Sequence, residues 1–487
     1  MGWLPRAVLR IQLSLFTRTM YSLDDTIVAI STPIGEGGIG IVRMSGPEAG
    51  DILRRLFVPG SRLRLPAALP GQEQAADLEP RVLHYGHVID PATGETADEV
   101  LAVYMPAPRT YTRQDVVEIN GHGGIVALRR VLAICLRQGA RLAEPGEFTA
   151  RAFLNGRLDL AQAEAVLDIV RARTETSLQA AVGQLAGRLS DQVRAVRAIL
   201  VGALAWVEAS IDFVEDEIPD RDIALDLEQA RAMLAHLVAD AERGIIYRQG
   251  VRAAIVGRPN VGKSSLLNRL LRTSRAIVTD IPGTTRDTLE ETLNLQGVPV
   301  VLVDTAGISA KPEDPIERLG IERSRAALIQ ANLALLVLDV SQPLTSADRA
   351  IAALVGDKPA IVVLNKVDLL PTKREAQCSL LDGRCVLVSA LTGEGLEVLE
   401  QAIVETVFSG QVTASEAPMV TSPRHKEALN RALDHVSAAY AAQEGGISPD
   451  LMAIDLSGAV NVLGEITGQT ASDDLVDTIF GNFCLGK

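Results

Sequence analysis

Two segments of the sequence have residue types and spacing suited to holding the phosphates of a nucleotide. GRPNVGKS, residues 257–264, follows an apolar run and opens a helix, so its backbone N–H groups point at phosphate oxygens. Within it, Lys263 adds a positive charge and the Ser264 hydroxyl can reach Mg²⁺. DTAG, residues 304–307, ends a later strand with a carboxylate toward the Mg²⁺ and the Gly307 N–H toward the γ-phosphate. These two elements in register predict nucleotide hydrolysis.

A third segment predicts that the base is guanine. NKVD, residues 365–368, lies at the carboxyl end of a predicted strand, where doubly wound sheets bind ligands. Asp368 can accept two hydrogen bonds from the guanine edge, and SAL, residues 389–391, can donate a backbone N–H to the guanine oxygen. The residues predicted to bind GTP are Asn260, Val261, Gly262, Lys263, Ser264, Ser265, Thr279, Asp280, Ile281, Pro282, Gly283, Thr284, Thr285, Asp304, Thr305, Ala306, Gly307, Asn365, Lys366, Val367, Asp368, Ser389, Ala390 and Leu391.

One group common at such sites is missing from the sequence. Ras-like proteins carry a water-orienting glutamine directly after DTAG, whereas Ile308 stands here and can neither donate nor accept a hydrogen bond. Asn260 and the oxygen-rich segment 278–285 can instead hold a monovalent cation beside the phosphates, and Thr285 can complete the Mg²⁺ shell. The alternative is that Asn260 only ties the loop.

The last residues, GNFCLGK, allow three interpretations: a frayed tail, a lipid anchor or part of an active site. Gly486 and Lys487 fill the last two places, which disfavours a prenylation box. The preceding segment predicts a helix docked on a helical body, which would hold the thiol of Cys484 in a fixed position as a nucleophile. The apolar residues at helical spacing are Leu475, Val476, Ile479 and Phe480.

The elements that must position these residues divide the chain into an α+β part, a helical part and an inserted α/β part. Runs at residues 26–34, 81–90, 99–106 and 115–124 predict short strands or turns and thus an N-terminal α+β domain at residues 23–146. Helical spacing, as at residues 225–244, predicts a helical domain in two pieces, 147–249 and 411–487. Strands alternate with helices at residues 250–410, which predicts an inserted, parallel, doubly wound domain. Its predicted strands are 252–257, 298–307, 331–340, 358–368 and 385–390.

Composition limits the class of protein. The 487 residues carry a formal charge of −14, which argues against coating nucleic acid by bulk electrostatics, and 3% aromatic residues make a base-stacking surface unexpected. The longest apolar run, residues 333–338, is too short to cross a bilayer, so no membrane contact is expected.

Residues 1–22 are treated as an extension outside the fold. Arg6, Arg10 and Arg18 occur there before the first acidic residue, as in an organelle presequence, and a start codon assigned too early, with Met20 the true start, explains them equally well. The expected location is the cytoplasm, or the mitochondrion if the extension is a presequence.

From about Leu23 to Lys487 the chain resembles the tRNA-modification GTPases called MnmE or TrmE. The resemblance rests on DTIVAISTPIGEGGIGIVRMSG, GHGG, EPGEFTARAFLNGRLDLAQAEAVLDIV, GRPNVGKSSLLN, DIPGTTRD, DTAGI and a terminal CLGK, in which the commoner form is CIGK. It implies an N-terminal domain that binds a folate and forms a homodimer, a helical domain carrying the terminal cysteine, and a G domain inserted in the helical one.

The resemblance also implies a reaction and a partner. With a flavoprotein called MnmG, members of the family modify carbon 5 of the wobble uridine of certain tRNAs, using a tetrahydrofolate derivative with a formyl or methylene unit, and the product carries an aminomethyl-type group. The folate contacts transfer to Arg43, Glu118, Arg157 and Lys487. Arg157 stands where the family commonly has lysine, which keeps the charge and changes its geometry.

The same transfer assigns the ions and the catalytic groups. Potassium falls on Asn260, Thr279, Ile281 and Thr284, and magnesium falls on Ser264 and Thr285. The catalytic residues implied are Lys263, Cys484 and Glu317, the last as the group that orients the attacking water. The loop before Glu317, residues 309–315, is longer than is common in the family, which weakens that assignment.

Two other classes of protein share part of these motifs. A ribosome-assembly GTPase shares GRPNVGKS and NKVD, but the N-terminal third and the terminal cysteine do not fit it. A regulatory scaffold, whose G domain only times an interaction, needs the same nucleotide motifs, and Cys484 separates it from an enzyme of the modification chemistry.

Overall fold

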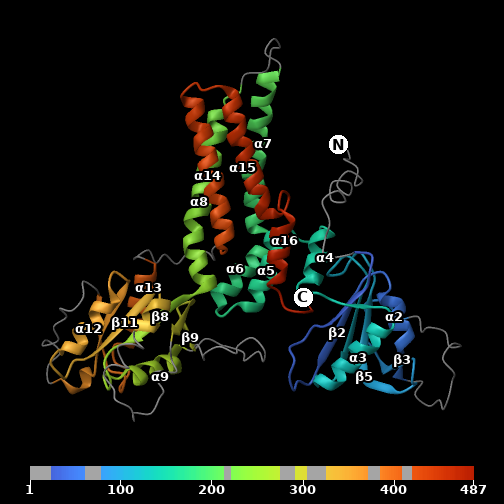
Figure 1. Ribbon diagram of the computed structural model, residues 1–487, viewed down its shortest axis with the longest axis horizontal. Helices are drawn as coiled ribbons and strands as arrows, with labels where there is room; N and C mark the ends of the chain where they lie inside the picture. Colours follow the sequence, from blue (N-terminus) through green and yellow to red (C-terminus); the bar gives the residue numbers. More distant parts are fainter. Residues whose placement is uncertain are drawn as a thin grey trace. The chain divides into compact units, whose positions relative to one another are not determined.

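The computed structural model describes residues 23–60, 78–212, 221–274, 291–303, 325–370, 384–408 and 419–486 (Figure 1). The described residues form two compact units, one made of residues 23–167 and 464–486 and the other of those between Asp168 and Leu463. Each unit contains a β-sheet and helices, so the predicted combination of α+β, helical and doubly wound α/β structure is confirmed. The predicted domain boundaries stay predictions. None of the described helices is long and apolar enough to cross a membrane.

The first unit is built on a seven-stranded sheet of order β3-β4-β5-β6-β2-β1-β7. Its neighbouring strands pair antiparallel, except that β1 pairs parallel with β7. β1, β4, β5 and β6 lie at the runs predicted to be short strands or turns, with β5 beginning earlier than predicted, at Thr96, and β2, β3 and β7 are additional. The strands are β1 Ile27–Ile30, β2 Gly40–Ser45, β3 Phe57–Pro59, β4 His84–Ile89, β5 Thr96–Met105, β6 Val116–Gly121 and β7 Arg141–Leu142.

Two helices contribute to the apolar core of this sheet. α2 (Ala49–Leu56) contributes Ile52, Leu53 and Leu56, and α3 (Ile125–Arg137) contributes residues three or four apart, such as Leu128 and Val131. Because this spacing places the side chains on one face of each helix, they pack with the inward-facing strand residues Val28, Val42, Val88, Val117 and Ile119.

Three further helices of the first unit hold the end of the chain. α4 (Glu147–Leu154) and the start of α5 (Leu160–Arg171) pack against α16 (Asp473–Gly481). Phe480 and Phe483 are buried there, with their ring centroids 5.6 Å apart, among side chains that include Ala150 and Leu160. The predicted docking of the tail on helices is therefore confirmed, with Ile479 and Phe480 buried and Leu475 and Val476 partly buried.

Long helices form one part of the second unit, where α14 packs along α8 and α8 along α7 (Figure 1). α6 begins with a capping box, in which the Thr174 hydroxyl accepts from Ser177 N and the Ser177 hydroxyl accepts from Thr174 N. α8 is longer than the predicted helix at residues 225–244, because Ile246 and Tyr247 pack against the core of the second sheet. These helices are α6 Glu175–Leu185, α7 Arg188–Asp212, α8 Ile223–Gln249, α14 Pro423–Glu444 and α15 Pro449–Thr467.

The second sheet has six strands in the order β13-β12-β11-β8-β10-β9. Alternate side chains of its strands enter two cores, as Ala253 and Ile255 do on one face and Ala254 and Val256 on the other. This is the two-sided burial expected of a doubly wound sheet. Its strands are β8 Val251–Val256, β9 Glu291–Leu295, β10 Val298–Val303, β11 Leu333–Asp339, β12 Ala360–Asn365 and β13 Arg384–Val388, and its helices are α9 Lys263–Ser274, α12 Ser346–Val355 and α13 Leu396–Val407.

The expectation of an entirely parallel sheet is wrong at its edge. β9 pairs antiparallel with β10 through a two-residue loop, Gln296–Gly297. Both loop residues have positive φ, 51° and 90°, which matches the twist of a tight hairpin. The turn was not predicted because Gln296 stands where such turns usually have asparagine or aspartate.

Candidate functional site

The phosphate loop lies between β8 and α9 and depends on two glycines. Gly257 has φ +151°, and a Cβ there would lie 2.4 Å from the carbonyl oxygen of Val337. Gly262 has φ +98°, and a Cβ there would lie 2.2 Å from Nδ2 of Asn365. No other residue type fits either position without displacing its neighbours, so the loop backbone is set by close packing against the ends of β11 and β12.

The lysine of the loop is held by the loop itself. Lys263 Nζ donates to the carbonyl oxygens of Gly257 and Arg258, at 2.7 Å each. Burial lowers the pKa of Lys263 to about 8, since charged ammonium is poorly solvated there. The amine therefore carries its charge at neutral pH and loses it in mildly alkaline solution.

A single buried side chain joins three of the predicted nucleotide segments. Asn365 Nδ2 donates to the Val261 carbonyl at 2.8 Å, and Asn365 Oδ1 accepts from Ala390 N at 3.0 Å. The sequence assigned these three residues separately, and the structure brings them together at the carboxyl ends of β8, β12 and β13. Such convergence is the expected place for a ligand on this type of sheet.

The base-recognition segment is also fixed by side chains. Asp368 Oδ1 accepts from Ser389 Oγ at 2.6 Å, which orients the carboxylate predicted to bind guanine. Lys366 has φ +69°, and its ammonium donates to Asp339 at 2.6 Å. Although burial alone raises it, the pKa of Asp339 is held below its ordinary value by hydrogen bonds from Lys366 and Ser341.

Only part of the predicted ion and water sites falls within the described residues. Asn260, at φ +64°, is exposed, and Ser264 is exposed in the first turn of α9. Oxygen groups of this kind suit K⁺ and Mg²⁺. The predicted residues that lie outside the described ranges are Thr279, Asp280, Ile281, Pro282, Gly283, Thr284, Thr285, Asp304, Thr305, Ala306, Gly307 and Glu317. Among the residues that are described, no three His, Cys, Asp or Glu side chains are grouped to hold a metal ion.

A second cluster of predicted residues occurs in the first unit. Arg43 and Glu118 face each other as register partners on β2 and β6. The Arg43 Nε and Nη2 atoms lie 2.8 and 2.7 Å from Glu118 Oε1, and the Arg43 Cζ atom lies 6.0 Å from the centre of the Phe148 ring. This pair offers a guanidinium and a carboxylate to a polar, planar ligand.

The tail reaches this same cluster. The Gly486 carbonyl accepts from Ser31 Oγ at 3.2 Å and from Arg43 Nη1 at 3.5 Å, and the Cys484 carbonyl accepts from Gly146 N at 3.4 Å. Between these points the thiol of Cys484 is exposed and free of disulfide bonds. The tail thus contacts Arg43 through Gly486, two residues after the predicted nucleophile Cys484. The predicted contact of Lys487 lies outside the described residues.

Arg157 stands over an aromatic ring in this cluster. Its Cζ lies 4.8 Å from the centre of the Tyr111 ring, and the Tyr111 hydroxyl is 2.9 Å from Thr149 Oγ1. Burial raises the pKa of Tyr111, outweighing the opposite effects of Thr149, Arg157 and Arg43. A planar guanidinium stacks in this way better than a lysine ammonium would, which fits arginine at this position.

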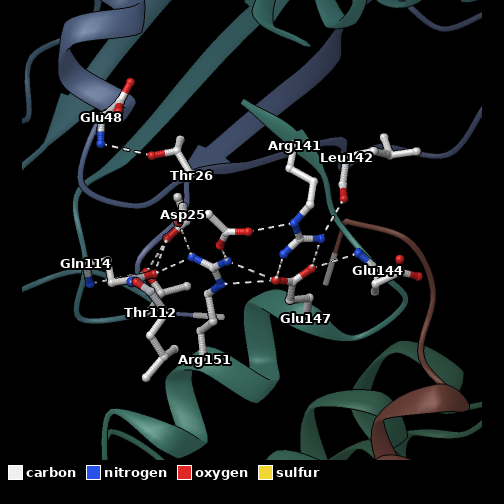
Figure 2. A network of polar contacts seen from close by, with 12 residues as sticks. Asp25, Thr26, Glu48, Thr112, Gln114, Arg141, Leu142, Glu144, Glu147 and Arg151 are labelled. Atoms are coloured by element: carbon white, nitrogen blue, oxygen red, sulfur yellow. Dashed lines mark hydrogen bonds and ion pairs between the residues drawn. The ribbon is translucent and has the colours of Figure 1, made fainter. Parts of the chain in front are cut away.

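A buried charge network under this cluster was not predicted from sequence. Figure 2 shows that the guanidinium groups of Arg151 and Arg141 each contact both carboxylates, those of Asp25 and Glu147. The side chains of Arg151 and Glu147 are fully buried and 2.9 Å apart, while Arg141 lies 2.6 Å from Glu147 and 2.7 Å from Asp25. The network ties the start of α4 to β1 and β7. The signal available was the pair of opposite charges four residues apart in EFTAR.

Comparisons with known proteins cover most of the chain. Residues 160–484 match the family model of the MnmE helical domain, and residues 26–157 match that of the GTP-binding protein TrmE N-terminus. The tRNA modification GTPase MnmE of Roseiflexus castenholzii is 52% identical over 95% of this chain and 99% of its own length. Proteins of the same name from Chloroflexus aurantiacus and Desulforamulus reducens are 49% and 45% identical, over 96% of this chain and 100% of their own. The chain therefore belongs to the MnmE family of tRNA modification GTPases.

Proposed function

We propose that this GTPase, stimulated by potassium and working with the flavoprotein MnmG, adds an aminomethyl-type group to carbon 5 of the wobble uridine of certain tRNAs. The one-carbon unit comes from a tetrahydrofolate derivative carrying a formyl or methylene group. The observation that supports this proposal is the packing of the tail, in which the Gly486 carbonyl accepts from Arg43 and the exposed Cys484 lies two residues before it.

In the nucleotide half of the reaction, Asn365 keeps the phosphate loop and the base segment in one arrangement while Lys263 neutralises phosphate charge. Ser264 and Thr285 would hold magnesium, and Asn260, Thr279, Ile281 and Thr284 would hold potassium. Potassium supplies positive charge beside the phosphates, which is needed because Ile308 offers no polar group. Glu317 orients the attacking water.

In the folate half, the charged pair and the aromatic groups fit a ligand with a flat, hydrogen-bonding ring and carboxylates. Glu118 can accept from ring N–H groups, whereas Arg43 and Arg157 can donate to carbonyl or carboxylate oxygens. Lys487 adds a further cation. The folate supplies the one-carbon unit, and this chain binds it and holds the Cys484 thiol at the reacting face as a nucleophile.

The partners follow from the family. The relatives' shared name supports a tRNA substrate, and we further propose a homodimer through the N-terminal domain and a complex with the flavoprotein.

The test uses a strain that lacks the gene. Wobble-uridine analysis of its tRNA should show loss of the modified base, restored by the wild-type chain and not by Cys484→Ser. The variant changes one atom of an exposed side chain, so its GTPase activity should stay near the wild-type rate. Normal modification by Cys484→Ser would remove the cysteine from the chemistry, and normal tRNA in the deletion strain would refute the proposal as a whole.

A further inference from the structure

The second residue of the phosphate loop is tied to a helix outside the nucleotide motifs. The Arg258 Nε atom lies 3.2 Å from Oδ1 of Asp348, and Nη2 donates to Gln342 Oε1 at 3.0 Å. The Asp348 side chain is 2% exposed and that of Arg258 19%. The two charges therefore face each other largely out of water, where their attraction is little screened.

The carboxylate in this pair is itself immobilised. Asp348 lies in the first turn of α12, where its Oδ2 accepts from Thr345 N at 2.9 Å and from Thr345 Oγ1 at 2.7 Å. Among the described residues, Oδ1 has no hydrogen-bond partner, and it forms an ion pair with the Arg258 guanidinium. Since a buried carboxylate without a counter-charge is costly, Arg258 is the group that makes Asp348 tolerable there.

The backbone of Arg258 contacts the other end of the loop. Its carbonyl oxygen accepts from Lys263 Nζ at 2.7 Å. The side chain of Arg258 is thus held by α12, while its backbone carbonyl accepts a hydrogen bond from Lys263, the lysine predicted to bind the phosphates. A shift of Arg258 would move an anchor of Lys263, although neither Arg258 nor Asp348 belongs to the residues predicted to bind GTP.

We propose that Arg258 and Asp348 are a positioning pair for GTP hydrolysis, which sets the phosphate loop and the location of Lys263 for the phosphates. They act through Lys263 and not by touching the nucleotide. Because the Nε–Oδ1 pair is held by charge without a hydrogen bond, lysine at position 258 should preserve much of the effect.

The test is a double-mutant cycle in the full-length chain. Arg258→Gln and Asp348→Asn should each weaken GDP binding and raise KM for GTP on the order of tenfold, and the double variant should be no worse than the single ones. Arg258→Lys should recover most of the affinity. Arg384→Gln is the matched control, because it removes an arginine paired with Glu405 on the same sheet and away from the loop, and it should leave KM unchanged.

Three results would overturn the proposal. The first is unchanged nucleotide affinity in both single variants, with or without a fall in melting temperature. The second is a loss of affinity in the double variant equal to the product of the two single losses, because that is the result expected of two independent residues. The third is no recovery with Arg258→Lys while the melting temperature returns to the wild-type value.

Discussion

Asn365 and Val261 are joined by a hydrogen bond of 2.8 Å between a side-chain amide and a backbone carbonyl, 104 positions apart in the chain. The bond is buried, so water does not compete for it. The segments predicted to bind the base and the phosphates are therefore held together by this bond. We expect a change in one segment to alter the position of the other.

Exchanging the base-recognising carboxylate should change the preferred nucleotide. Asp368→Asn loses two charge-assisted hydrogen bonds to guanine, which costs roughly 3 kcal/mol or about a hundredfold in affinity, and it should favour xanthosine triphosphate. Titration with both nucleotides measures the exchange. Unchanged GTP affinity in Asp368→Asn would contradict the assigned role of NKVD.

Replacing potassium by sodium should slow GTP hydrolysis. Because Ile308 stands in place of a polar residue, we expect a bound cation to supply the positive charge at the transition state, and removing comparable stabilisation costs about 3 to 4 kcal/mol, or a few hundredfold in rate. Rates in the two chlorides at equal ionic strength give the answer. Equal rates would exclude the proposed potassium site and the role of Asn260 as a potassium ligand.

Nucleotide affinity should fall in alkaline solution. Lys263 loses its proton as pH rises through about 8, and phosphate binds the ammonium form, so the Kd for GDP should rise roughly tenfold per pH unit above 8 until the bound state also titrates. Lys263→Arg keeps its charge over this range and should remove this part of the pH dependence. A wild-type profile that matches that of the arginine variant would show that Lys263 is not the titrating group.

Disturbing the packing of the C-terminal residues should abolish tRNA modification and leave GTP hydrolysis intact. Gly486 has φ +87°, and a Cβ there would lie 2.5 Å from the Ile30 carbonyl oxygen, so Gly486→Ala adds backbone strain of about 1 to 2 kcal/mol as well as a clash. We expect faster removal of the last residues by carboxypeptidase and a loss of wobble-uridine modification, with GTPase activity retained.

The matched control for this variant is Leu485→Ala, since Leu485 is 56% exposed. It should behave as wild type in both assays. Normal wobble-uridine modification by Gly486→Ala would show that the packing of the C-terminal residues is not required for this reaction.

The sequence predicted the elements whose patterns are local. Buried strands such as β11 and β12 appear as continuous apolar runs, and α16 as apolar residues at helical spacing, so both were identified. The β9–β10 hairpin was missed because its turn is Gln-Gly, and the length of α8 was underestimated because Tyr247, in its last turn, packs on Phe408 far along the chain. Such tertiary contacts leave no periodic signal.

The nucleotide residues were assigned from motifs that each carry their own chemistry, and their roles stay predictions. The motifs did not predict the hydrogen bonds between them, such as those of Asn365 with Val261 and Ala390. These bonds depend on the order of the strands in the sheet. For Arg43, Glu118 and Arg157, resemblance alone gave the assignment, because no local spacing links three residues on separate elements. Arg258 and Asp348 had no signal of either kind.

The buried pair of Arg151 and Glu147 also limits how this chain can diverge. Loss of Arg151 leaves Glu147 with Arg141 as its counter-charge, whereas loss of Glu147 leaves two guanidinium groups, Arg151 and Arg141, to share the single carboxylate of Asp25. Both losses weaken the network, and the second leaves an excess of positive charge beside a fully buried arginine. A change at position 147 should therefore be inherited together with a change at position 151.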